Sequence, residues 1–411
     1  MTVDYDPFGR SVMSDPFPAY AELREHCPVH HYDGFDPPFF SLSRYDDVSA
    51  ALRDTRTYSS VHGQGPRRTS SGGLFTDPPE HTAFRRLLQQ AFTPRAVAEM
   101  DGFVAALADE LVAAVADRGR ADLHDALAAP LPTITIATML GVSPEDQHRF
   151  KAWSDALVAS MGSQDPMAHR TERAEVEAYL LDHVDARRRL VAAGEPLPTD
   201  LISALVRAED DGAVLTPQEI LGSIVQLLVG GNETTTSLMT NALVRLMDRP
   251  ELLDQVAADP MLCEGAAKRE RTFGLVDAVV EESLRFDAPV LGLFRTTTCP
   301  VELHGVAIPA EAKVMLLYAA ANRDGDAFAD PDDFRLDRPL TEARRHLAFG
   351  AGVHFCLGAA LARLEARHAL RAAISRLPRL RPTEPAERIT PFLLWGRRSL
   401  PVEWDVPGHG G

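Results

Sequence analysis

The sequence has few cysteines, few aromatic residues and no long hydrophobic run. Only four cysteines occur in 411 residues, and no two form a CxxC pair, which argues against a zinc site. No run of 18 apolar residues is present, so we expect no membrane span. The first twenty residues lack a basic region followed by an apolar one, so no secretory signal is visible and we expect a cytoplasmic protein.

Basic residues are also in the minority. The chain has 42 lysines and arginines against 59 aspartates and glutamates, which gives a net charge of −17. Nucleic acid repels such an acidic surface, so we expect no nucleic acid as a partner. The balance suits a soluble protein that binds a small neutral or apolar molecule.

The chain has enough hydrophobic residues for a large helical core, because they make up 45% of it. Short elements are expected in 15–54, and helical patterns dominate from about 79 to 285. A β-like stretch covers 289–317, a Pro/Asp-rich meander follows at 322–347, and a small hairpin is expected in 391–404. We find no internal repeat or long linker, so the prediction is one domain, mainly α with small β-sheets.

Residues 61–76 form a Gly/Ser-rich loop that is long for a compact domain. Loops of this kind tend to be lids or binding loops.

A long helix is predicted from Thr216, with Pro217 at its first position, to about Asp248. Its centre reads LLVGGNETTTSLM, and each glycine there costs roughly 1 kcal/mol of helix stability relative to alanine. One explanation is a kink at a tight helix contact, which the stretch alone favours. The other is a groove for a flat ligand beside Gly230, with Glu233 and Thr234 as a proton path.

The second unusual stretch is the loop around Cys356. Gly350, Gly352 and Gly358 surround the cysteine just before a predicted helix, whose N-terminus stabilises negative charge. A thiolate held in this way can ligate haem iron. The glycines do not form a dinucleotide-binding GxGxxG pattern, and a nucleophilic cysteine would need more than His354 as its base.

These stretches together resemble the cytochrome P450 family, most closely its soluble bacterial members. The resemblance covers nearly the whole chain and rests on five segments. They are FGAGVHFCLG at 349–358, EESLR at 281–285, DPDDFRLDRP at 330–339, DPPEHTAFRRLLQQAFTPR at 77–95 and GGNETT at 230–235.

The resemblance implies a triangular helical prism that holds haem b (iron protoporphyrin IX). It implies an N-terminal extension at 1–20, a haem-thiolate domain at 21–405 and a flexible tail at 406–411. The implied reaction inserts one atom of O2 into a lipophilic molecule by hydroxylation or epoxidation. A steroid, terpenoid, polyketide or fatty-acid-like substrate would fit equally well.

The resemblance also assigns roles to individual residues. Cys356 would be the thiolate ligand of the iron, with Gly230, Phe349 and Gly358 beside the porphyrin. Glu233 and Thr234 would be the catalytic acid–alcohol pair. The partners of the haem propionates would be His81, Arg85, Arg295 and His354. Glu282, Arg285 and Arg338 would form a buried cluster that supports the cysteine loop, and the first two are three residues apart on a helix.

The substrate pocket should lie on the same side as the centre of the long helix. Its candidate residues are apolar, and each could equally be ordinary core: Val229, Val290, Leu291, Leu293, Phe392 and Leu393.

The chain contains no iron–sulfur motif, so we expect electrons from a separate ferredoxin-type donor, and we expect a monomer. A basic docking patch is one interpretation of four arginines near the cysteine loop, and a solvated helix face is the other: Arg344, Arg345, Arg363 and Arg367.

Two departures from the family pattern concern the long helix. Gly230 replaces the alanine of many relatives, and Asn232 replaces their histidine. Alternative functions are a haem-binding sensor or carrier, a peroxide-using peroxygenase and a haem-thiolate isomerase. The intact Glu233–Thr234 pair argues against all three, because a carrier needs no proton path and some of the other enzymes replace the pair.

Overall fold

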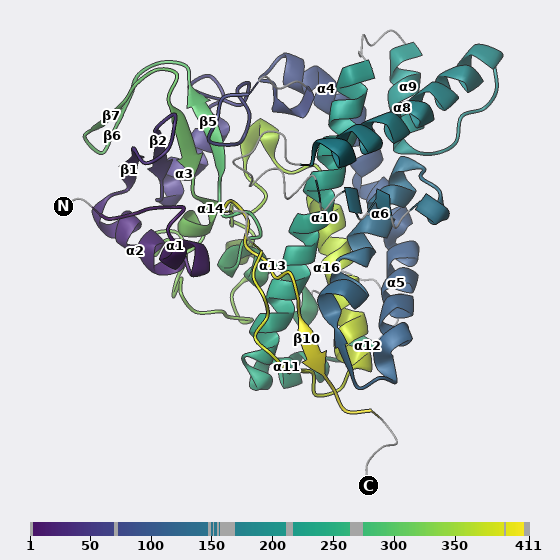
Figure 1. Ribbon diagram of the computed structural model, residues 1–411. Coiled ribbons are helices and arrows are strands. Elements are labelled where there is room, and N and C mark those ends of the chain that lie inside the picture. The colour runs from purple at the N-terminus through teal and green to yellow at the C-terminus, as the bar shows by residue number, and fades with distance from the viewer. Residues whose placement is uncertain are drawn as a thin grey trace.

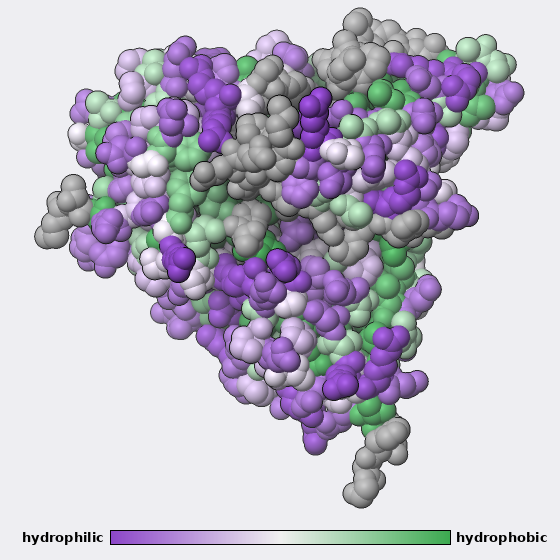
Figure 2. Space-filling model, in the orientation of Figure 1, coloured by the Kyte–Doolittle hydropathy of each residue, from purple (hydrophilic) through white to green (hydrophobic). Residues whose placement is uncertain are grey.

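The computed structural model has a triangular outline (Figure 1). Strands β1, β2, β5, β6 and β7 and the N-terminus lie on the left, whereas most of the long helices and strand β10 lie on the right. Figure 2 shows a mostly hydrophilic surface on this face, as expected for a strongly charged chain. The structure describes residues 3–69, 73–146, 149–150, 152–153, 156, 169–210, 217–263, 274–389 and 392–406.

The α-helices in chain order are α1 (Arg10–Ser14), α2 (Phe17–His26), α3 (Tyr45–Arg53), α4 (Glu80–Gln89), α5 (Pro94–Ala116), α6 (Pro130–Leu140), α8 (Arg170–Ala193), α9 (Leu201–Asp210), α10 (Pro217–Met247), α11 (Pro250–Ala257), α12 (Pro260–Cys263), α13 (Leu275–Phe286), α14 (Tyr318–Ala321), α15 (Leu340–Ala343) and α16 (Ala359–Arg376). Short 3₁₀ turns include η1 (Gly73–Phe75) and η5 (Gly352–His354), and η3 (His124–Ala128) is a π-helical turn. No helix in these described ranges is both long and apolar enough to cross a membrane.

The largest sheet has five strands in the order β1–β2–β8–β5–β3, where β2 and β8 are parallel and the other pairs are antiparallel. A three-stranded sheet has the order β4–β10–β9, and β6 pairs with β7. The strands are β1 (Val29–Tyr32), β2 (Phe39–Leu42), β3 (Tyr58–Ser59), β4 (Arg120–Asp122), β5 (Leu293–Thr297), β6 (Val301–Leu303), β7 (Val306–Ile308), β8 (Lys313–Leu316), β9 (Arg381–Pro382) and β10 (Pro401–Glu403).

Helix α10 runs through the middle of the helical side (Figure 1) and contacts α6, α13 and α16. It begins at Pro217, as predicted, and ends at Met247 shortly before Pro250, because proline cannot continue a helix. Thr216, the predicted cap, lies outside the described residues. The predicted class, mainly helical with small sheets, is confirmed.

Three expectations concerned the ends of the chain: a hairpin in 391–404, a boundary at residue 20 and a flexible tail. The predicted hairpin in 391–404 is displaced, because Arg398 N–H bonds the Glu387 carbonyl while β10 pairs with β4 and β9. The proposed boundary at residue 20 falls inside α2, and Tyr5 and Tyr20 are buried in the main core. Residues 407–411 of the expected tail lie outside the described residues.

Candidate active site

The loop that carries Cys356 is shaped by two glycines and closed by a backbone hydrogen bond. Gly350 and Gly352 have positive φ angles of 68° and 69°, which L side chains rarely adopt. A Cβ at Gly352 would also lie 2.9 Å from the carbonyl oxygen of Leu52. The Cys356 N–H donates to the Phe349 carbonyl at 2.9 Å, so the loop turns back on itself just before α16.

The Cys356 side chain has exposed surface, although protein atoms crowd around its sulfur. Burial raises the pKa of the thiol. The backbone N–H groups of Gly358 and Ala359 and the charges of Arg85 and Arg363 act in the opposite direction. An exposed residue whose thiol is desolvated is what a cysteine at the wall of a cofactor site would show.

The four predicted propionate partners converge beside this loop. The rings of His81 and His354 have centroids 4.1 Å apart. Burial, together with the charges of His354, Arg85 and Arg295, lowers the pKa of His81 to about 4. His81 is only 1% exposed, yet neither ring nitrogen has a hydrogen-bond partner among the described residues. A buried polar side chain without partners is costly, and a nearby anion would satisfy it.

His354 has partners that the sequence did not indicate. Its Nε2 lies 3.2 Å from the Ser60 hydroxyl and 3.9 Å from the Asp77 carboxylate, and Asp77 also accepts from the Ser60 N–H at 3.0 Å. Burial acts to raise the pKa of Asp77, but the hydrogen bonds from His354, Ser59 and Ser60 outweigh it and lower the pKa. Asp77 stands just before α4 in the quoted segment 77–95, so its position was the only available signal.

A cleft of about 940 Å³ lies against this group of residues. His81 and Arg85 line it, together with Arg56, Arg86 and Val353, whereas neither Cys356 nor any residue of α10 does. The cleft is therefore an outer approach to the propionate group and not the pocket beside α10.

The centre of α10 faces open space, whereas residues in the turns on either side of it are buried. Gly230 is exposed, whereas Leu228 and Asn232 are buried. A Cβ built on Gly230 or Gly231 would meet no atom within 4 Å. Tight helix packing would place atoms there, so the predicted packing kink does not explain these glycines.

The Thr234 hydroxyl donates to the Gly230 carbonyl at 2.6 Å, and α10 stays helical through this point. Such a bond is the usual way for a mid-helix threonine to satisfy its donor. Glu233 beside it is half-buried. Asn232 points elsewhere, because its side-chain oxygen accepts from Thr133 of α6 at 3.0 Å. Its departure from the family pattern is therefore a contact between helices.

Two of the predicted substrate-pocket residues, Leu291 and Phe392, pack against the N-terminal segment. Leu291 and Leu393 are buried, and the Leu291 N–H donates to the Leu393 carbonyl at 2.8 Å. The Phe392 ring packs on Phe8 with centroids 4.6 Å apart, and Leu291 and Phe392 share a cavity of only about 10 Å³ with Tyr5. This placement favours the core alternative for Leu291 and Phe392. Val290 and Leu293 are half-buried, and the Val229 side chain lies outside the described residues.

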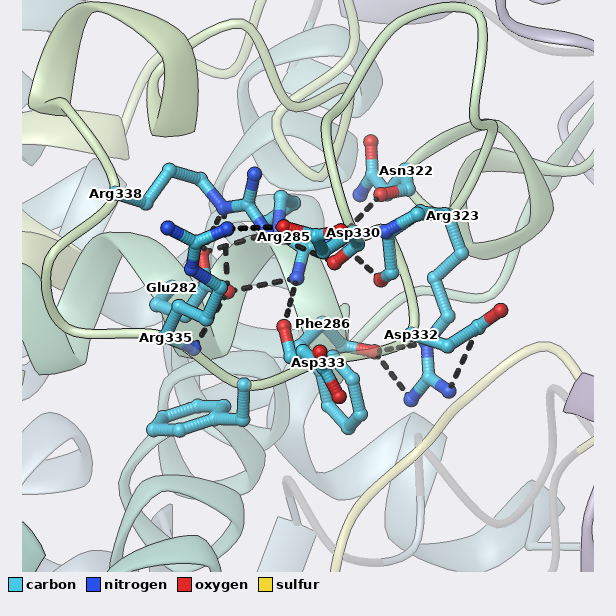
Figure 3. A network of polar contacts seen from close by, with 12 residues as sticks. Glu282, Arg285, Phe286, Asn322, Arg323, Asp330, Asp332, Asp333, Arg335 and Arg338 are labelled. Carbon is cyan, nitrogen blue, oxygen red and sulfur yellow. Dashed lines mark hydrogen bonds and ion pairs between the residues drawn. The ribbon is translucent and has the colours of Figure 1, made fainter.

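Figure 3 shows Glu282, Arg285 and Arg338 together in a buried network. Arg285 binds the Glu282 carboxylate at 2.7 and 3.0 Å, and Arg338 binds it at 3.1 and 3.3 Å. Arg285 also donates to the Asn322 carbonyl, while the Asn322 side chain accepts from the Leu347 N–H at 2.6 Å. This path leads from Glu282 to the start of the cysteine loop.

A second buried carboxylate, Glu281, was missed by the sequence reasoning. Arg363 of α16 binds it at 2.7 and 3.0 Å, Arg344 at 3.2 Å, and His346 Nε2 lies at 3.3 Å. Because Arg363 also stacks on the Phe349 ring at 4.6 Å, Glu281 links α13 to both sides of the cysteine loop.

Three of the four arginines in the predicted basic patch near the cysteine loop form ion pairs with buried or half-buried carboxylates. Glu281 pairs with Arg344 and Arg363, and Arg367 binds Asp277 at 2.6 Å. Arg345 is exposed and stacks on Tyr45. Sequence spacing gave no sign of these acidic partners.

Glu281 gives a prediction for acid stability. Burial would raise its pKa, but hydrogen bonds from His346 and Arg363 outweigh this and hold the pKa well below the ordinary 4.5. The folded chain therefore binds fewer protons here than the unfolded chain, so Glu281 stabilises the fold above about pH 4.5 and loses this effect as pH falls. We expect Glu281→Gln to be less stable near neutral pH but to lose less stability on acidification. Urea midpoints across the acid range measure this, and parallel curves for the two proteins would contradict it.

The residues present fit a haem group. Among the described residues the buried nitrogens of His81 have no partner, the open space beside Gly230 would admit added atoms, and Cys356 offers a soft sulfur. Cys356 would hold the iron, and His81, Arg85, Arg295 and His354 would bind the propionates. Haem iron with a cysteine thiolate ligand supplies activation of O2.

Comparison with known proteins agrees with this fit. The family model for Cytochrome P450 matches residues 22–390. Cytochrome P450 monooxygenase PikC of Streptomyces venezuelae is 37% identical over 419 residues, covering 98% of this chain and 94% of PikC. Cyclomarin C epoxidase CymV of Salinispora arenicola is 35% identical, covering 95% of this chain and 92% of the relative.

Among solved structures, cytochrome P450 CYP109Q5 from Chondromyces apiculatus superposes with a TM-score of 0.85. Its sequence is 37% identical, and the match covers 99% of each chain. Both the family match and these whole-length similarities exceed what a shared fold alone would give. This chain belongs to the cytochrome P450 family and is a haem-dependent monooxygenase.

Proposed function

We propose that the chain uses haem b to insert one atom of O2 into a lipophilic small molecule, by hydroxylation or epoxidation. The observation that carries this proposal is the convergence of His81, Arg85, Arg295 and His354 beside the loop of Cys356, and an open segment at the centre of α10 supports it. The epoxidase among the relatives supports both types of oxygen insertion for the same fold.

In this proposal the residues of α10 deliver protons and leave space for the cofactor and the substrate. Thr234 places its hydroxyl at the exposed face beside Gly230, where it can hold a proton for the oxygen being reduced. Glu233 supplies that proton from the half-buried side of the helix. The missing side chains at Gly230 and Gly231 leave room for porphyrin and substrate.

His81, Arg85, Arg295 and His354 orient the cofactor by binding its carboxylates. Asp77 and Ser60 hold the His354 ring in place. The Glu282 and Glu281 networks fix the cysteine loop from two sides, so the position of the sulfur depends on both.

The electron donor is proposed to be a separate ferredoxin that docks at the outer cleft. Arg56 and Arg86 on its rim are exposed, and neither has an ion pair with a described carboxylate. A small acidic protein matches such a surface and is guided to it by charge. We further propose a cytoplasmic monomer whose haem domain, predicted for residues 21–405, also includes the N-terminal segment that buries Tyr5 and Tyr20.

Turnover in isotopically labelled O2 tests the proposed reaction. Lipophilic compounds are first screened for the spectral change that accompanies substrate binding, and those that bind are then oxidised with ferredoxin and its reductase. We expect one labelled oxygen atom in each product molecule. Product oxygen derived from water would contradict oxygen insertion, and product formed from added peroxide alone would favour a peroxygenase.

A further inference from the structure

Lys313 is a buried lysine that the proposed reaction does not use. It begins β8, and only 1% of the residue is exposed. Lysine is almost never fully buried unless it is paired, yet no described carboxylate forms an ion pair with Lys313. The charges of Arg295 and Arg68, both cations, lower its pKa further after burial, and its hydrogen-bond partners are neutral carbonyl oxygens.

Those oxygens belong to loop 61–69. The Lys313 ammonium donates to the carbonyl of Gly63 at 2.9 Å and to that of His62 at 3.2 Å. Hydrogen bonds from a charged donor are roughly twice as strong as neutral ones. The next carbonyl, that of Gln64, accepts from the Phe294 N–H of β5 at 3.0 Å. Three consecutive carbonyls of the loop are thus bound to β5 and β8.

The residues before and after this loop both lie near parts of the candidate active site. Ser60, just before it, contacts His354 of the propionate group. Beyond it, a Cβ on Gly73 would lie 3.3 Å from the hydroxyl of Ser223 on α10. Ser223 precedes Gly230 by about two helical turns. The described residues on the two sides of this stretch therefore lie against the propionate group and against α10, about two turns before its open segment.

We propose that Lys313 is a positioning residue that fixes loop 61–69 beside the substrate entrance and so limits which lipophilic molecules enter. This inference rests on the proposed function, because the entrance matters only if a substrate binds beside α10. A wholly structural lysine would instead support β5 and β8 themselves, which are already paired along Leu293–Thr296.

Hydrogen exchange of the full chain distinguishes the two roles and needs no haem. In Lys313→Met we expect the Phe294 N–H to exchange at least about tenfold faster, equivalent to about 1.4 kcal/mol. Amides of the β2–β8 pairing should stay as protected as before, because methionine fills the buried space without a charge. The matched control is Arg68→Met, which removes the exposed pair with Glu311 and the contact with the His62 ring but no hydrogen bond to a loop carbonyl, and it should leave Phe294 unchanged.

Unchanged exchange at Phe294, or faster exchange throughout β2, β5 and β8, would overturn the positioning role. The effect on entry is measured with two haem ligands, imidazole and the larger 4-phenylimidazole. We expect Lys313→Met to speed association of 4-phenylimidazole several-fold and to leave imidazole unchanged. Equal changes for the two ligands would overturn the role in entry. Failure of imidazole to bind the unaltered protein would contradict the proposed function instead.

Discussion

Glu282→Ala is expected to give little folded, haem-loaded protein. The carboxylate of Glu282 accepts hydrogen bonds from Arg285, Arg338 and the Arg335 N–H, and both of the first two side chains are buried. Its loss leaves two buried cations without their shared anion, which costs about 3–5 kcal/mol. Because a whole protein is stable by only about 5–15 kcal/mol, this is a large part of the total. Haem content and the urea midpoint of the purified variant measure the effect.

Glu342→Gln is the matched control for this prediction. Glu342 also binds Arg338, at 2.5 Å, but its side chain is 26% exposed and it does not contact Arg285. We expect its loss to cost about 1 kcal/mol or less and to leave haem content unchanged. Normal haem content in Glu282→Ala, or equal losses in both variants, would show that the buried network does not support the cysteine loop.

Thr234→Ala is expected to separate O2 consumption from product formation. The Thr234 hydroxyl is anchored on the Gly230 carbonyl at the open face of α10, where it can hold a proton for the oxygen being reduced. Positioned proton donors contribute roughly 10²–10⁴-fold to rates, so we expect product per electron to fall by about tenfold or more. The lost electrons should appear as hydrogen peroxide, which is quantified beside O2 uptake and product.

The control for this variant is Thr236→Ala on the same helix. The Thr236 hydroxyl donates to the Ala128 carbonyl at 2.9 Å and is buried against η3, away from Gly230. Its removal should lower stability but keep the ratio of product to peroxide. A Thr234→Ala variant with the original ratio would remove Thr234 from the proton path.

Whether a contact could be predicted from the sequence depends on how far apart its two residues lie along the chain. The Glu282–Arg285 pair is local, because residues three positions apart on a helix share one face, and the start of α10 at Pro217 is equally local. The pairing of Glu281 with Arg363 joins residues 82 positions apart, and no spacing rule indicates it. For the same reason a docking patch stayed one of two interpretations of the arginines near the cysteine loop: the acidic partners of Arg344, Arg363 and Arg367 come from α13.

Apolar residues gave the weakest predictions. Phe392 and Leu291 have the composition of a substrate pocket, but hydrophobicity does not say whether the neighbour is a ligand or another part of the chain. Here the neighbours are Phe8 and Tyr5 of the N-terminal segment. The glycines of α10 show the opposite case: their purpose could not be decided from the helix alone, and the empty space around Gly230 favours the ligand groove.

The central claim is that Cys356 ligates haem iron as a thiolate. The spectrum of the reduced protein with carbon monoxide tests it most directly, because a thiolate ligand moves the main absorption band well to the red of that given by a histidine ligand. We predict the red-shifted band for the unaltered chain and its loss in Cys356→His. A histidine-type band from the freshly purified, unaltered chain would contradict the account.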